Sequence, residues 1–126
     1  MAAITITNAG LNLLRDGMSG ANTPLITYVE VGTGNTAPSA SDTHLVAPSF
    51  RKAVTSYTNG ASAGEILINA YFGPGDDVGD NIAEVAFWGG STATSALGTG
   101  IMLARGLYTH TKLNSESIQF QLDLVV

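Results

Sequence analysis

The chain contains no cysteine, and charged residues make up only 12% of its 126 residues. The lack of cysteine excludes disulfides, thiolate metal ligands and cysteine nucleophiles together. The charged share is about half of the roughly 25% that globular domains usually carry. A surface with so few charges is poorly solvated, and obligate interfaces between subunits have this character. We therefore expect other subunits to cover much of the exterior.

Long apolar runs and clusters of basic residues are also missing. The longest uncharged stretch, residues 85–104, is interrupted by glycine, serine and threonine and does not predict a membrane span. The five basic residues are scattered along a chain of net charge −5 and form no stripe that would neutralise phosphates. We expect neither a nucleic acid nor a membrane as a partner. The N-terminus does not predict a secretory signal.

Alternating apolar and polar residues predict the strands. Between residues 117 and 126, five apolar residues alternate with polar ones and fall on one face of a strand. Five further strands are predicted at 25–31, 49–57, 65–72, 82–88 and 101–108, separated by turn-rich loops. Before them, Thr7 or Asn8 caps one short helix that carries Leu11, Leu14 and Met18 on one face and ends at Gly17 or Gly20.

These elements predict a mainly β protein. One helix followed by six short strands is typical of a single antiparallel β-sandwich or barrel-like domain. A chain of 126 residues is long enough to enclose one hydrophobic core. We therefore expect one domain over residues 1–126, with one short N-terminal helix.

Six segments occur in an order that extends over nearly the whole chain. They are residues 6–14, 26–35 with Pro38, 43–51, 82–90, 97–106 and 118–126. In this order they resemble the N-terminal domain of phage tail-collar fibre proteins, which attaches the fibre to the baseplate. Ile82-Ala-Glu-Val-Ala-Phe-Trp-Gly-Gly is similar to that family's strand of the form Ile-x-Glu-Leu-Gly-Leu-Phe-Asp. It departs from the family over 86–89, near the turn.

The resemblance implies a non-enzymatic structural protein of a tailed phage virion, assembled in the host cytoplasm. Fibres of this family are trimeric, which implies a homotrimer that contacts other virion proteins. In typical fibres a long shaft and a receptor-binding tip follow this domain, whereas the present sequence stops at Val126. We therefore expect a fibre-attachment or adaptor protein at the baseplate or neck. A capsid decoration protein is the alternative.

An acidic loop is the only candidate for a metal site. Asp76, Asp77 and Asp80 lie within it, and Glu84 follows in the next strand. Calcium takes about six to eight oxygen ligands, but the spacing here is not that of an EF-hand. A solvated turn between two strands accounts for the same residues. We predict no metal site and no cofactor.

No group of residues predicts catalysis. His44 and His110 are the only histidines, and Asp42 lies near the first. A Ser-His-Asp hydrolase needs a serine held against the histidine, and the Gly-x-Ser-x-Gly turn is absent. The segment Gly32-Thr-Gly-Asn-Thr lacks the lysine and the helix of a phosphate-binding loop, so it predicts a turn. We predict that the protein is not an enzyme.

Four aromatic residues lie in two neighbouring predicted strands. Phe72 and Phe87 share the parity of their apolar neighbours, which predicts that they are in the core. A sugar-stacking platform of these aromatics would instead make the protein a carbohydrate-binding, receptor-recognition module. Trp88 has the opposite parity and precedes two glycines, which predicts a strand end that faces a partner subunit. The candidate interface residues are Trp88, Gly89, Gly90 and Tyr71.

Overall fold

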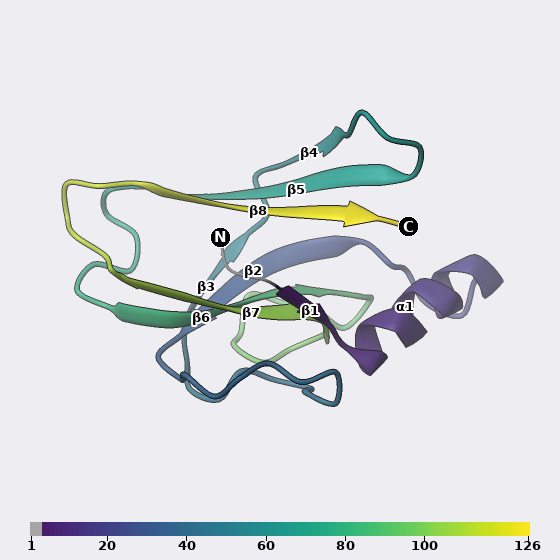
Figure 1. Ribbon diagram of the computed structural model, residues 1–126, viewed down its shortest axis with the longest axis horizontal. Helices are drawn as coiled ribbons and strands as arrows, with labels where there is room; N and C mark the ends of the chain where they lie inside the picture. The colour runs from purple at the N-terminus through teal and green to yellow at the C-terminus, as the bar shows by residue number, and fades with distance from the viewer. Residues whose placement is uncertain (1–3) are drawn as a thin grey trace.

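Two antiparallel β-sheets face each other in the computed structural model, which describes residues 4–126 (Figure 1). This arrangement confirms the prediction of a mainly β sandwich with one short helix near the N-terminus. The larger sheet has the strand order β1-β7-β6-β2-β3, and the smaller has the order β4-β5-β8. The elements are β1 (Ile4–Ile6), α1 (Asn8–Ser19), β2 (Ile26–Gly32), β3 (Pro48–Ala53), β4 (Ser56–Asn59), β5 (Glu65–Phe72), β6 (Asn81–Gly89), β7 (Ile101–Thr111) and β8 (Ile118–Val125).

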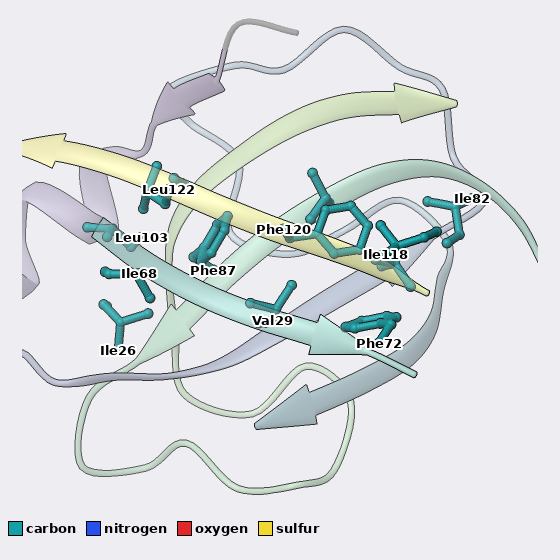
Figure 2. Packing of buried hydrophobic residues seen from close by; sticks show 14 of the residues in the cluster. Ile26, Val29, Ile68, Phe72, Ile82, Phe87, Leu103, Ile118, Phe120 and Leu122 are labelled. Carbon is teal, nitrogen blue, oxygen red and sulfur yellow. The ribbon is translucent and has the colours of Figure 1, made fainter. Parts of the chain in front are cut away.

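The core lies between the two sheets (Figure 2). Side chains from β2, β6 and β7 meet side chains from β5 and β8, and the buried residues that meet there are apolar. Phe72 and Phe87 are fully buried, which confirms their predicted place in the core. The rings of Phe72 and Phe120 meet edge to face with their centroids 5.2 Å apart.

The predicted strand over residues 49–57 is two strands in different sheets. Val54 N–H donates to Thr27 O beside the larger sheet, and Thr55 N–H donates to Asn69 O in the smaller sheet. The chain therefore crosses between the layers at this dipeptide, which the alternation of side chains does not reveal. The crossover closes one side of the sandwich. On the opposite side, the two sheets end in the edge strands β1 and β8.

Helix α1 begins and ends as its sequence predicts. The Thr7 hydroxyl accepts a hydrogen bond from Gly10 N–H, and Gly20 closes the helix in the left-handed conformation with φ of 79°. The helix packs on β7 with the face that carries Gly10 and Leu13, its two buried residues. A Cβ on Gly10 would lie 2.5 Å from Leu103 O, so glycine permits the close approach that turns this face inward. Leu11 and Met18 are left exposed.

Strand β8 pairs with β5 along its whole length, from Phe72 opposite Ile118 to Glu65 opposite Val125. Ile118, Phe120 and Leu122 are buried, as the alternation predicts. The far end of the strand differs, since Leu124 is only half-buried and Val126 is 75% exposed. This end of the strand borders an open groove beside α1.

Candidate docking surface

The outer face of the larger sheet is covered by two loops, residues 33–47 and 90–100 (Figure 1). Beneath them, Leu45, Ala86, Trp88 and Met102 form a second apolar cluster. Trp88 is 1% exposed, so the prediction that it faces a partner subunit is wrong for the chain as described. Its parity does point away from the main core. The two loops of the same chain cover Trp88, where the prediction placed a partner subunit.

Loop 33–47 is held to the sheet by the buried carboxylate of Glu84. One carboxylate oxygen accepts from Val46 N–H at 3.0 Å, and the other accepts from Gly34 N–H at 2.9 Å and Ala47 N–H at 2.8 Å. Arg105 completes the ion pair, with its Nε and Nη2 both 3.0 Å from the carboxylate. Glu84 therefore anchors the loop. The turn Gly32-Thr-Gly-Asn-Thr uses Gly34 N–H to bind this carboxylate of the same chain.

Loop 90–100 is held in a similar way by Glu30 and Arg51. The Glu30 carboxylate accepts from Arg51 Nε and from Gly98 N–H, both at 2.9 Å. Arg51 Nη1 donates to the carbonyls of Thr94 and Thr99 at 2.8 and 2.9 Å. The same guanidinium stacks on the Trp88 ring, 4.8 Å from its centroid. The buried ion pairs Glu84–Arg105 and Glu30–Arg51 thus hold both loops against the sheet, and the loops cover Trp88.

The remaining aromatic and glycine candidates are divided between the interior and the surface. Gly89 is buried against Leu25 O, and Gly90 is half-buried. Tyr71, on the outer face of the smaller sheet, is 46% exposed and is the one candidate interface side chain at the surface. Because Phe72, Phe87 and Trp88 are buried, the four aromatics do not form a sugar-stacking platform.

The acidic loop makes internal contacts. Asp76 pairs with Lys52, whose hydrogen bond lowers the pKa of that carboxyl, and Asp80 accepts from the Ser49 hydroxyl at 2.5 Å. Within residues 4–126, no group of three or more histidine, aspartate or glutamate side chains is placed to hold a metal ion. Asp77 has φ of 52°, and burial followed by the neighbouring Asp80 raises its pKa to about 7.

Asp77 gives the protein a pH dependence that can be measured. The unfolded chain releases this proton near pH 3.8, whereas the folded chain keeps it up to about pH 7. The folded state thus binds more protons within that window, and the resulting stability is lost as the pH rises through about 7. Asp77→Asn removes the ionisation and suits the left-handed conformation. Relative to wild type, it should gain more in melting temperature at pH 8 than at pH 5, and nothing below about pH 3.8.

Differential scanning calorimetry at both pH values measures this effect. Asp16→Asn, at a surface carboxyl paired with Arg15, is the matched control. Equal gains for Asp77→Asn at pH 5 and pH 8 would contradict the assignment.

The histidines form hydrogen bonds within the chain. His44 Nδ1 lies 2.8 Å from Leu45 O, and His110 Nε2 lies 2.7 Å from the Glu116 carboxylate. Asp42 accepts from Arg105 Nη1 at 3.2 Å and has no hydrogen bond to His44 among the contacts of the described chain. Asp42 and His44, two positions apart in the sequence, thus bond to different partners.

An apolar groove opens between α1 and the end of β8. Figure 1 shows the helix and the C-terminus at the same end of the sandwich. The groove has a volume of about 620 Å³, and none of the described residues that line it has a charged side chain. Met18, 87% exposed, and Val126 stand at its rim. The lining residues are Ile6, Leu11, Leu14, Gly17, Met18, Pro24, Leu124, Val125 and Val126.

The groove follows from two features of the chain. Gly10 turns the helix so that Leu11, Leu14 and Met18 border the open side of the sandwich. The end of β8 then adds Leu124, Val125 and Val126 to the same groove. Apolar side chains gathered in one exposed concave surface mark an interaction site more often than scattered ones do. The stripe at Leu11, Leu14 and Met18 was the signal in the sequence, although the sequence does not reveal which helix face packs inward.

Comparison of the chain with protein-family models, curated protein sequences and solved structures finds no match. Among the described residues, no helix is long and apolar enough to cross a membrane.

Proposed function

We propose that this chain is a non-enzymatic structural component of a tailed phage virion, a fibre-attachment or adaptor protein at the baseplate or neck. The apolar groove between α1 and β8 is the observation that carries the proposal, because it is an uncharged concave surface suited to docking another protein. The ordered resemblance to tail-collar fibre proteins supports the virion location. The buried charge pairs support a structural role, since they brace loops.

The proposal includes a homotrimer that uses a surface outside the groove. Tyr71 lies on the outer face of the smaller sheet, where Gln119 and Gln121 donate to Asn69 Oδ1 at 3.0 and 2.8 Å. This neutral part of the face would suit contact between copies, and closed cyclic symmetry would limit the assembly to a defined size. Light scattering of the purified protein measures the oligomeric state, and a stable monomer would contradict the trimer.

Met18→Lys tests the groove in assembled particles. A charge at this exposed position should leave the fold within about 0.5 kcal/mol of wild type, because the side chain contributes little to the core. In the groove, however, it should sharply reduce the amount of the chain in purified virions. Leu113→Lys, at a 56% exposed position outside the groove, is the matched control. Quantitative mass spectrometry of purified particles measures both variants.

The copy number from the same measurement distinguishes an adaptor from a capsid decoration protein. A few copies per wild-type particle fit an adaptor, whereas hundreds would replace this assignment by a capsid decoration protein. Absence of the wild-type chain from purified particles would contradict the virion assignment itself. Normal incorporation of Met18→Lys would remove the groove from the docking surface.

A further inference from the structure

The outer edge of β8 runs along the open side of the sandwich and ends at the groove. In the smaller sheet, β8 pairs with β5 alone, and no other strand of residues 4–126 pairs with it. Val126 N–H donates to Gly64 O at 3.0 Å, so it points toward the β5 side. Because hydrogen-bonding direction alternates along an antiparallel strand, the backbone groups of Gln119, Gln121 and Asp123 point away from β5. These groups form an edge that an additional strand would complete.

The core side of this edge has hollows at both ends. The apolar groove lies at one end, and both Leu124 and Ile6 line it. A second hollow of about 270 Å³ lies near the other end, bordered by Tyr108, Phe120 and the two glutamines beside it. Residues of a strand alternate between its faces. An added strand with apolar residues at every second position would thus place them toward these hollows.

The outer side of the same edge is acidic. Asp123 and Glu65 share a hydrogen bond that raises the pKa of Asp123 and lowers the pKa of Glu65. Two adjacent carboxyls at a strand end favour a cation on the neighbouring strand. Within residues 4–126, every basic side chain of a second copy already contacts a carboxylate or a carbonyl oxygen, so a different protein is better suited to supply this cation. Of the five basic residues, Arg51, Arg105 and Lys112 have their charged groups in internal contacts, and Arg15 and Lys52 are paired with aspartates.

We propose that the free edge of β8 accepts an extended segment of a different protein, with apolar residues at alternate positions facing the groove and a lysine or arginine beside Asp123. Main-chain hydrogen bonds to β8 supply the binding, and the groove and the carboxyl pair supply the selectivity. The proposal deepens the proposed function, on which it rests for the role of the groove. It gives the chemistry of the docked partner.

A synthetic peptide provides the probe. Acetyl-Thr-Val-Thr-Val-Lys-Val-Thr-Val-Thr-amide has valines on one face and its lysine among the threonines on the other. One control peptide has glutamate in place of the lysine, and another has the same composition with the alternation scrambled. Binding of each peptide to the full chain is measured by fluorescence anisotropy. We expect the lysine peptide to bind most tightly and the scrambled peptide not to bind.

Gln121→Pro blocks the edge. It removes an N–H that points away from β5, so the pairing of β8 with β5 keeps its hydrogen bonds, and proline is tolerated at such edge positions. Gln121→Thr is the matched control, because both variants lose the side-chain bond to Asn69 and only proline loses the N–H. We expect binding of the lysine peptide to weaken about tenfold or more in Gln121→Pro relative to Gln121→Thr. Asp123→Asn should remove the preference for lysine over glutamate.

Several results would overturn the proposal. They are binding of none of the alternating peptides, equal binding by Gln121→Pro and Gln121→Thr when both melt like wild type, and a wild-type dimer that Gln121→Pro dissociates. Loss of binding in Met18→Lys but not in Gln121→Pro would assign the groove to a helix instead. Should Gln121→Pro unfold, hydrogen exchange of the wild-type chain decides, because the lysine peptide must then protect the Gln121 amide.

Failure of this proposal is distinguishable from failure of the proposed function. Peptide binding to a chain that is absent from virions would leave the edge assignment intact and remove the virion role. Normal incorporation of Gln121→Pro into particles, together with loss of Met18→Lys from them, would leave the virion role intact and remove the edge assignment.

Discussion

Replacement of Glu84 by alanine is expected to lower the free energy of unfolding by about 3–5 kcal/mol, a large part of the roughly 5–15 kcal/mol of a typical domain. The substitution leaves the buried guanidinium of Arg105 without its carboxylate partner and removes the acceptor for three backbone N–H groups of loop 33–47. The loop should separate from the sheet and expose Trp88, the single tryptophan. Urea denaturation measures the first effect, and a red shift of tryptophan emission measures the second.

Two further variants make this result specific. Glu84→Gln keeps the shape but loses the charge, so it should be less damaging than alanine. Asp123→Ala removes an exposed carboxylate from another strand and should change the stability by no more than about 0.5 kcal/mol. A Glu84→Ala protein with wild-type stability and unshifted emission would show that the loop does not depend on this carboxylate.

Trp88→Ala is expected to cost about 3–5 kcal/mol, the usual range for truncation of a buried tryptophan. The side chain fills the space beneath both loops, and its ring carries the Arg51 guanidinium. Its removal would leave a cavity and take away the ring on which Arg51 of the Glu30–Arg51 pair stacks. Circular dichroism in urea measures the loss.

Trp88→Phe is the matched variant for this prediction. It keeps an apolar ring beneath the loops and should lose less stability than alanine does. If Trp88→Ala instead unfolded like wild type but failed to enter virions, Trp88 would act at an interface, as its parity in the sequence had predicted.

Local patterns in the sequence predicted most of the fold. The alternation in β5 predicted its bounds without error, and the caps at Thr7 and Gly20 bounded the helix. The crossover at Val54 was not predictable, because consecutive alternation looks the same whether or not the strand changes sheets. The short strand β1 was also missed, since three residues contain too little pattern to recognise.

The candidate site was predicted less well, for a physical reason. Parity placed Trp88 on the outer face of the sheet, but parity does not reveal what covers that face. The cover depends on contacts between Glu84 and Gly34, fifty positions apart, and no local pattern reports such a distance. A clue was present in the charged residues inside strands, Glu30, Arg51, Glu84 and Arg105, because a chain with so little charge has few to spare for its interior.

The pairing of β1 with β7 bears on how the molecule folds. Ile4 lies opposite Gly106, and the Thr7 hydroxyl donates to Met102 O, a partner 95 positions later. Contacts between such distant segments form slowly, because a long loop must close before they contribute. During synthesis, the first strand must therefore wait for one of the last. The larger sheet can be completed only after residues 104–106 have been synthesised, and until then its apolar strands are open to aggregation.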